Sequence, residues 1–382
     1  MQTIDLERLS EVYRDPGLKL VDCRPSHAYN GWPMRDEVRG GHIPGARLFP
    51  RSWAENSYDA VLMGQLAQKG LTPDIPLIVY GHDEEDAMAL ARRLMMLGYD
   101  DLTVLDGGLS DWAARDDLEM SRLPRYTQLV YPQWVHRQLS GGEPGRGGHA
   151  LYHVNWGVPE EYERGHIPGA FYLNTESLES PVDWNRRTPE ELEETLLRLG
   201  ITRDTTVILY GRDTATDPKE QKPGRRAGQI AATRAAAILL YCGVEDVRLL
   251  DGGLNAWLAA GYDVETERHS PQPVDDFGVE IPARPDYFID FDEAVDLLAD
   301  PDGVLVSIRS RPENLGHTSG YNYIPEVGDI PGAVWGDCGT DAYHMQYYRS
   351  MDNTMRDFNE IASNWSTVGI TADKKIAFYC GT

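Results

Sequence analysis

Cysteine is scarce in this sequence, and the scarcity excludes two kinds of site. Only four cysteines occur in 382 residues: Cys23, Cys242, Cys338 and Cys380. They are too few and too scattered for a disulfide scaffold, and none belongs to a Cys-x-x-Cys pair. Because histidines also form no cluster along the chain, we expect no bound metal and no cofactor. We expect Cys23 and Cys242 to be small buried apolar side chains.

Long apolar runs and positive charge are also lacking. No apolar run approaches the ~20 residues that cross a bilayer, and residues 1–7 lack the features of a signal peptide. Either the protein is cytosolic or a leader is absent from this chain. The 36 Lys and Arg residues against 61 Asp and Glu give a formal net charge of -25. This charge argues against nucleic acid or an anionic membrane as partner, and an anionic substrate needs a local positive patch.

A repeated phrase organises the rest of the chain. Residues 41–46 read Gly-His-Ile-Pro-Gly-Ala, residues 165–170 repeat this unchanged, and residues 328–333 differ only by Asp329. A second phrase, Leu-Asp-Gly-Gly-Leu followed by Trp112 or Trp257, occurs twice and has no third copy. Repeats more than 100 residues apart indicate tandem domains.

Each repeat has the same order of expected elements. A strand is followed by the repeated turn, a short strand, a helix and an apolar central strand. One such helix is expected at residues 189–199, with Thr188 as its N-cap. In the first two repeats a further helix is expected after the central strand, at residues 87–97 and 225–241. Strands that alternate with helices predict an α/β fold in which a mainly parallel sheet is flanked by helices.

The central strands differ where they end. Residues 77–80 run into Gly81 and residues 207–210 into Gly211, whereas the third copy runs into Cys380. Parallel sheets of α/β proteins place reactive groups at the carboxyl edge, where these strands end. The pattern predicts one working site, at Cys380, and two silent ones.

Together, the repeated turn, the apolar strand ending in Tyr-Cys and the Asp-Gly-Gly phrase with its tryptophan resemble the rhodanese-like sulfurtransferase family, in particular its three-domain bacterial thiosulfate sulfurtransferases. The resemblance implies three tandem rhodanese-like domains, at 1–124, 125–270 and 280–382. The first two are degenerate and inactive. The third is catalytic but truncated, since at least the 25 residues between the equivalents of Gly81 and Asp106 are missing, and we expect this chain to be impaired. The family also suggests a periplasmic location.

The resemblance assigns Cys380 as the nucleophile of a sulfurtransferase. Its thiolate takes sulfane sulfur from thiosulfate or a protein persulfide donor, such as a cysteine desulfurase, and forms a persulfide. Cyanide, a small thiol or a protein thiol then accepts the sulfur. Gly381 is expected to let the backbone curl around the sulfur, and Thr382 to add a hydroxyl donor.

Thiosulfate is a dianion, so cations are expected near the nucleophile. Arg309 and Arg311 follow the first strand of the third repeat; Arg309 either contacts substrate or holds the loop. We expect Trp335 and His344 to shape the pocket. Cys338 is expected to be an incidental loop cysteine rather than a resolving thiol.

Two other readings stay open. A cysteine-loop phosphatase or arsenate reductase has a related fold, but its Cys-x5-Arg loop needs residues beyond Thr382. Alternatively, the chain is a non-catalytic scaffold that docks a sulfur-donor protein, a role we also expect for the first two repeats.

Overall fold

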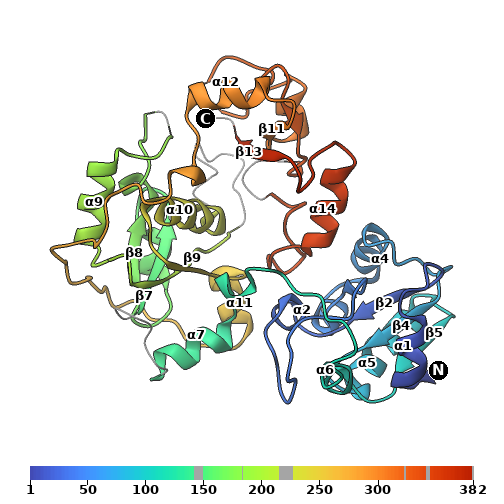
Figure 1. Ribbon diagram of the computed structural model, residues 1–382. Coiled ribbons are helices and arrows are strands. Elements are labelled where there is room, and N and C mark those ends of the chain that lie inside the picture. Colours follow the sequence, from blue (N-terminus) through green and yellow to red (C-terminus); the bar gives the residue numbers. More distant parts are fainter. Residues whose placement is uncertain (142–148, 183, 215–226, 322–323, 341–344, 381–382) are drawn as a thin grey trace. The chain divides into compact units, whose positions relative to one another are not determined.

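A computed structural model (Figure 1) describes residues 1–141, 149–182, 184–214, 227–321, 324–340 and 345–380. The chain divides into two compact units, Met1–Thr127 and Gln128–Thr382, each described here by itself. Within the described ranges no helix has both the length and the apolar character needed to cross a membrane.

The first unit is built on a five-stranded parallel sheet with the strand order β1-β5-β4-β2-β3. The strands are β1 (Gln2–Ile4), β2 (Lys19–Asp22), β3 (Arg47–Leu48), β4 (Leu77–Tyr80) and β5 (Leu102–Leu105). The helices are α1 (Leu6–Val12), α2 (Ser26–Asn30), α3 (Arg51–Glu55), α4 (Asp59–Gln68), α5 (Glu84–Met96) and α6 (Leu109–Ala113). The central strand β4 is buried along its whole length, as its apolar sequence predicts.

The second unit begins with a sheet of the same design. Its order, β6-β10-β9-β7-β8, matches that of the first sheet position by position. The strands are β6 (Leu129–Val130), β7 (His149–Asn155), β8 (Phe171–Asn174), β9 (Thr206–Tyr210) and β10 (Asp246–Leu250). The helices are α7 (Pro132–Leu139), α8 (Glu160–Arg164), α9 (Pro189–Arg198), α10 (Gly228–Cys242) and α11 (Gly253–Ala259), with 3-10 turns at Tyr126–Gln128 and Thr175–Ser177.

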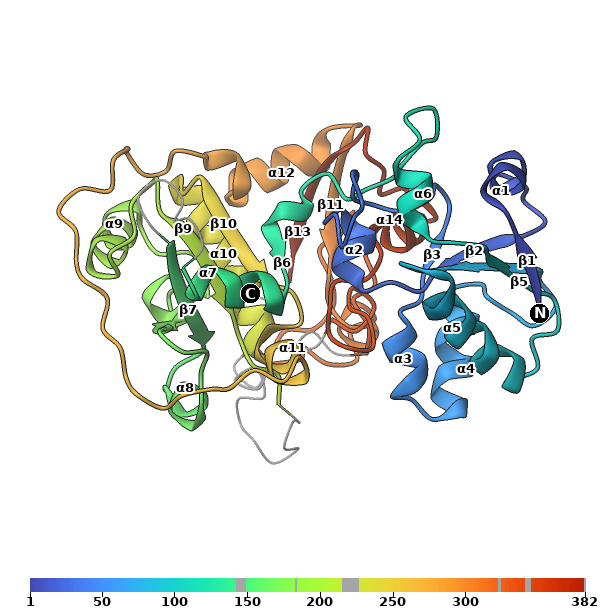
Figure 2. The same cartoon turned by 90° about the horizontal axis from the view of Figure 1, so that it is seen from below.

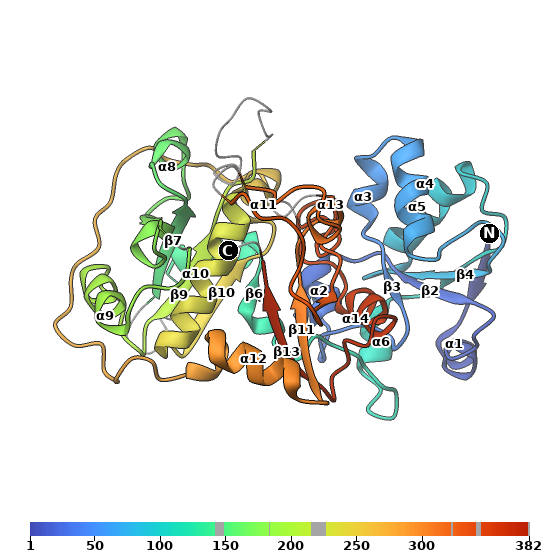
Figure 3. The same cartoon turned by 90° about the horizontal axis from the view of Figure 1, so that it is seen from above.

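A third, smaller sheet follows in the same unit (Figure 3). Its order is β12-β11-β13, and all three strands are parallel. The elements are a 3-10 turn (Pro285–Tyr287), α12 (Phe291–Ala299), β11 (Gly303–Ser307), α13 (Arg311–Asn314), β12 (Val334–Trp335), α14 (Phe358–Ser366) and β13 (Lys375–Tyr379). Its order reproduces β3-β2-β4 of the first sheet and β8-β7-β9 of the second.

Helix α10 provides much of the core of the second sheet, along which it lies (Figures 1 and 2). Its alanines let the helix approach the strands closely. The helix ends at Gly243, whose φ of 114° is left-handed and whose N–H bonds the carbonyls of Leu239 and Leu240. A side chain at Gly243 would lie 2.6 Å from the Cβ of Ala283, so glycine is required there.

The expected α/β fold with parallel sheets and flanking helices is confirmed. The Thr188 capping box of α9 is present as predicted, with Glu191 bonding back. Helix α5 begins three residues earlier than expected, because the Asp83 side chain caps the backbone N–H of Asp86. We missed β1 and β6, which are only two or three residues long and pair with β5 and β10.

Candidate active site

The three central strands end in register. Tyr80 pairs with Asp22, Tyr210 with His153, and Tyr379 with Ser307 on the neighbouring first strand of each sheet. The residues that follow these tyrosines, Gly81, Gly211 and Cys380, therefore occupy one equivalent position in the three sheets.

A shared hydrogen bond fixes each strand end. In each sheet the tyrosine hydroxyl accepts the backbone N–H of the isoleucine in the repeated turn. These bonds run from Ile43 to Tyr80 (3.1 Å), from Ile167 to Tyr210 (2.9 Å) and from Ile330 to Tyr379 (3.3 Å). The tyrosine before the cysteine or glycine thus ties the turn to the strand end.

Cys380 differs from the other cysteines in its exposure. Its thiol is only partly buried, and Sγ lies 3.5 Å from the hydroxyl of Tyr321. Cys23, Cys242 and Cys338 are buried. Burial raises the pKa of the Cys242 thiol to about 12 and that of Cys23 well above its ordinary range. A thiol held protonated in the core is a poor nucleophile, so Cys380 is the reactive candidate.

Arg309 supports the segment that carries Tyr321. Its side chain is buried, and its two terminal nitrogens donate to the carbonyls of Ser319 (3.0 Å) and Gly328 (2.5 Å). The Ser319 hydroxyl in turn bonds both the carbonyl and the N–H of Tyr321. Ser319 therefore links Arg309 to Tyr321, the residue that contacts the thiol. Both terminal nitrogens of Arg309 already donate to carbonyls of this loop.

Arg311 and Trp335 lie together. The Arg311 guanidinium stacks over the Trp335 ring, 4.4 Å from its centroid, and the indole N–H donates to the Arg309 carbonyl at 2.9 Å. Arg311 is exposed and also donates to the Asn314 side chain. Cys338 is fully buried.

Three residues expected at the site, Gly381, Thr382 and His344, lie outside the described residues.

Asp329 now has a physical explanation. Where the other turns carry histidine, its carboxylate accepts hydrogen bonds from the Tyr379 hydroxyl and the Asn314 amide. Burial alone raises the pKa of Asp329, but these hydrogen bonds outweigh burial and lower it. Burial, reinforced by Asp329, raises the pKa of Tyr379 to about 12. The substitution thus adds a second anchor for the tyrosine that precedes Cys380.

The positions of Gly81 and Gly211 have no room for a cysteine side chain. A Cβ atom on Gly211 would lie 2.0 Å from the carbonyl oxygen of Gly228, at the start of α10. A Cβ atom on Gly81 would lie 2.8 Å from the Cβ of Asp86 and 2.9 Å from the sulfur of Cys23. All three distances are shorter than the contacts of real Cβ atoms.

The segment before α14 contacts the Asp-Gly-Gly phrase of the second sheet. The N–H of Met355 donates to the Asp251 carboxylate at 2.8 Å, and Arg349 pairs with Asp213. Burial raises the pKa of Asp251 to about 7; the charge of Asp352 acts in the same direction, while Arg349 opposes it. The second and third sheets therefore share buried polar contacts.

Tyr321 is the site residue that we did not anticipate. It lies 59 residues before Cys380, in a segment without a repeated phrase. Its one sequence signal is a longer connection before the third repeated turn. Arg309 donates to the Gly328 carbonyl 19 positions later, whereas Arg24 donates to the equivalent Gly41 carbonyl 17 positions later.

Comparisons with known proteins agree with this architecture. The model of the rhodanese-like domain matches residues 5–115 and 154–260. The chain is 40% identical over 370 residues to the thiosulfate sulfurtransferase YnjE of Escherichia coli, covering 95% of this chain and 80% of the relative. It is 29% identical over 231 residues to the sulfur carrier protein TtuD of Thermus thermophilus, covering 57% of this chain and 72% of that protein.

Solved structures also resemble the whole chain. The anaerobic ergothioneine biosynthesis enzyme of Chlorobium limicola, bound to trimethyl histidine, has a TM-score of 0.96 and 40% identity, covering 100% of this chain and 90% of that one. A variant of EanB with a cysteine persulfide and ergothioneine has a TM-score of 0.95 at 40% identity, with the same coverage. The family model covers more than half of this chain, and its relatives are named as sulfurtransferases. The chain therefore belongs to the rhodanese-like family and is an enzyme of the sulfurtransferase type.

Proposed function

We propose that this protein transfers sulfane sulfur through a persulfide on Cys380. The observation that carries the proposal is the partly exposed thiol at the end of β13, within 3.5 Å of the Tyr321 hydroxyl. A nucleophile needs access to its donor, and the other three cysteines are buried.

The proposal includes a third rhodanese-like domain. The strand order β12-β11-β13 and the bond from Ile330 to Tyr379 match their counterparts in the first two sheets. We place the domains at 1–124, 125–270 and 280–382, with catalysis in the third and no catalysis at Gly81 or Gly211. The crowding around both glycines supports their silence.

The spacing of residues in a relative supports the assignment of the site. In the EanB variant with the persulfide, the substituted tyrosine and the persulfide cysteine are 59 residues apart, as are Tyr321 and Cys380. Two further EanB structures carry a substitution of a threonine two residues after that cysteine, and Thr382 holds this place here.

The reaction proceeds in two displacements. The Cys380 thiolate attacks the outer sulfur of thiosulfate, the sulfur–sulfur bond of thiosulfate breaks, and sulfite leaves with the electron pair. The enzyme then carries a persulfide. A thiophilic acceptor such as cyanide attacks the outer sulfur, leaves as thiocyanate and restores the thiolate. A protein persulfide can replace thiosulfate as donor, and a thiol can replace cyanide as acceptor.

The surrounding residues have distinct roles in this proposal. Gly381 and Thr382 supply N–H and hydroxyl donors to the persulfide and its leaving group. Arg311, stacked on Trp335, is the exposed cation for an anionic donor. Arg309 positions Tyr321 through Ser319. The hydroxyl of Tyr321 can hold or move a proton at the Cys380 sulfur.

Mass spectrometry of the intact protein after brief thiosulfate treatment tests the proposal. We expect an adduct of about 32 Da, the mass of one sulfur atom, that cyanide removes. Cys380→Ser should abolish the adduct, whereas Cys338→Ser, which alters a buried cysteine, should retain it. An adduct that survives Cys380→Ser would refute the assignment. An absence of any adduct, with a protein persulfide donor also inactive, favours the scaffold role.

The Tyr321 contact favours a second candidate, in which the acceptor is a carbon atom rather than a thiophile. Trimethyl histidine is described as the natural substrate of the Chlorobium limicola enzyme. In such a transfer the outer sulfur of the Cys380 persulfide replaces a hydrogen on the imidazole ring. The ring hydrogen ends as a proton and Cys380 is released as a thiol, so the exchange needs no further oxidant.

One competition experiment separates the two candidates. The persulfide enzyme is mixed with cyanide and trimethyl histidine at equal concentration, and thiocyanate and ergothioneine are quantified. Ergothioneine as the main product supports the carbon acceptor, and thiocyanate alone supports the thiophilic one.

A further inference from the structure

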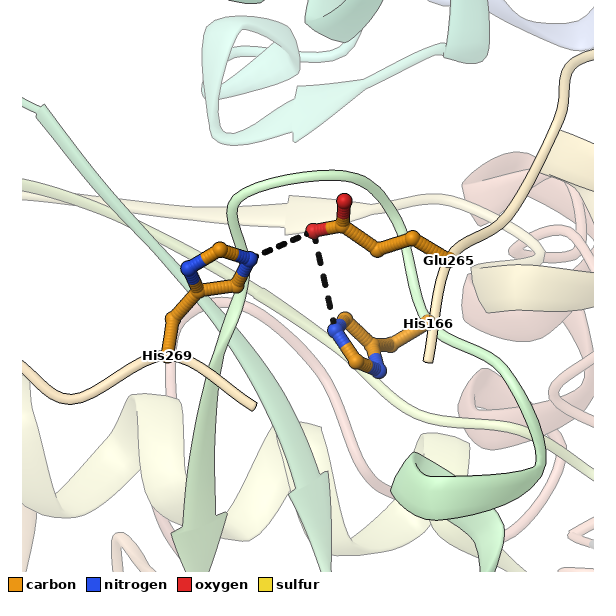
Figure 4. A group of neighbouring side chains, drawn as sticks. All are labelled: His166, Glu265 and His269. Carbon is orange, nitrogen blue, oxygen red and sulfur yellow. Dashed lines mark hydrogen bonds and ion pairs between the residues drawn. The ribbon is translucent and has the colours of Figure 1, made fainter. Parts of the chain in front are cut away.

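Two histidines and a glutamate meet in the second repeat, away from Cys380. His166 belongs to the repeated turn, and Glu265 and His269 lie on the segment that follows α11. One candidate ligand atom from each of the three side chains lies within 4.8 Å of the others. Figure 4 shows one Glu265 oxygen between the two rings. The sequence shows no histidine cluster along the chain, because the fold brings together residues about 100 positions apart.

We propose that His166, Glu265 and His269 form a binding site for a divalent transition-metal ion of the zinc type. Two imidazoles and one carboxylate are a common ligand set for this class of ion, and three protein ligands leave one position open. The proposal is independent of the reaction at Cys380.

The backbone around His166 prepares this ring as a ligand. Its Nδ1 lies 2.8 Å from the carbonyl oxygen of Tyr162, which only accepts and therefore keeps a hydrogen on Nδ1 when Nε2 ligates an ion. The ring also stacks on Tyr162 with the centroids 3.7 Å apart and the planes 5° from parallel. A metal-binding histidine commonly donates its second nitrogen to such a carbonyl, which directs Nε2 toward the ion.

The distances suit one shared ion. Nε2 of His269 lies 2.7 Å from the Glu265 oxygen, and Nε2 of His166 lies 3.7 Å from the same atom. Ligand atoms at about 2.0–2.1 Å from a tetrahedral ion are about 3.3 Å apart, so small side-chain shifts suffice. Ion binding replaces the contact of Nε2 of His166 with the carbonyl oxygen of Glu267, 2.9 Å away, and this oxygen is a candidate fourth ligand.

The site combines a buried anchor with an open side. The His166 side chain is fully buried, whereas the side chains of Glu265 and His269 are 28% and 31% exposed. An ion can thus enter from solvent. The N–H of Gly169 also donates to Glu265 at 2.5 Å, which holds the carboxylate against the turn.

The equivalent turns lack this set. In the first unit His42 pairs with Ser121 where His166 pairs with Glu265, and serine offers no carboxylate. The third turn carries Asp329, which already bonds Tyr379 and Asn314. The proposed site is therefore a property of the second repeat. Its consequence is a metal bridge between the turn and the segment that leads to the third sheet.

Metal titration of the full chain, without an affinity tag and after chelator treatment, tests the proposal. We expect one equivalent of Zn²⁺ to bind and Co²⁺ to give the visible absorption of a four-coordinate site. The melting temperature should rise by about 5 °C or more at a hundredfold excess over Kd. His269→Ala and Glu265→Gln should each weaken binding by about 100-fold or more, since even outer partners of metal ligands contribute 10–100-fold.

His317→Ala is the matched control, because His317 is exposed and outside the cluster. It should bind Zn²⁺ like the unaltered chain. Both key variants alter partly exposed side chains, and circular dichroism checks their folding. The proposal is overturned if His269→Ala binds Zn²⁺ as tightly as the unaltered chain. It is also overturned if the unaltered chain binds Zn²⁺ no more tightly than Glu265→Gln. In either case the cluster is an ion pair only.

Discussion

The ends of the central strands of the second and third sheets differ by what fills the space beside them. After β9, the start of α10 lies against Gly211 so closely that no Cβ fits. After β13, Cys380 keeps a partly exposed thiol next to the Tyr321 hydroxyl. The strand, the turn and the tyrosine hydrogen bond are thus the same at both sites. At one site α10 occupies the space next to the strand end, and at the other a thiol is accessible. At Gly211 the surrounding backbone thus excludes a cysteine side chain.

The largest effect on sulfur transfer is expected from replacing Cys380, which follows β13. Cys380→Ser should lower sulfur transfer by at least about 10³-fold, because the three remaining cysteines are buried and do not reach the sulfur donor. Thiocyanate production from thiosulfate and cyanide measures it, or ergothioneine production if trimethyl histidine is the acceptor. Cys242→Ser, at a buried thiol, serves as control. Equal loss in both variants would indicate misfolding rather than chemistry.

We expect a cysteine at Gly211, which follows β9, to destabilise the protein. Gly211→Cys is expected to lower the free energy of unfolding by about 3 kcal/mol or more, because the new Cβ overlaps the Gly228 carbonyl. It should restore no persulfide. Urea denaturation followed by circular dichroism measures the change. Gly64→Ala, on exposed α4 with open space around it, should change stability by less than about 1 kcal/mol. A stable Gly211→Cys protein that carries a persulfide at this position would contradict the argument that α10 excludes a side chain there.

The Asp-Gly-Gly phrases can be compared through pH. Because the pKa of Asp251 is raised to about 7 in the folded protein, the carboxyl ionises earlier in the unfolded chain. Its contribution to stability is complete below pH ~4 and is lost as the pH rises to about 7. Asp251→Asn should remove a loss of about 3–4 kcal/mol between these pH values. Asp106→Asn, at the exposed aspartate of the equivalent phrase in the first sheet, is the control. Identical profiles for Asp251→Asn and the unaltered chain would contradict this.

The smallest effect is expected at the hydroxyl beside the thiol. Tyr321→Phe should slow transfer by about 10-fold, since one proton-handling group is lost while the nucleophile remains. The persulfide adduct should still form, and the pH profile of the rate should change. Tyr347→Phe, at an exposed tyrosine of the same unit, provides the control. A rate equal to that of the unaltered protein would remove Tyr321 from the mechanism.

The sequence predicted the parts of the molecule that repeat. The parallel sheets, the glycine strand ends and the place of Cys380 followed from phrases that occur two or three times. The contact of Tyr321 with Cys380 could not be predicted, because a loop 59 residues away forms it and no repeat marks it. The proximity of His166 to His269 could not be predicted either, because the two residues are about 100 positions apart and only the fold brings them together. The strands β1 and β6 were too short for an alternating pattern to reveal them.

The contacts between the second and third sheets have a consequence for cooperativity. Asp251 with Met355, Arg349 with Asp213, and Arg186 with Asp290 link residues that are about 100 or more positions apart, all within Gln128–Thr382. Losing the third sheet would leave the Asp251 carboxyl without its backbone donor. These two sheets are therefore expected to melt as one calorimetric transition, so that the strand before Cys380 loses its structure at the temperature at which the second sheet unfolds.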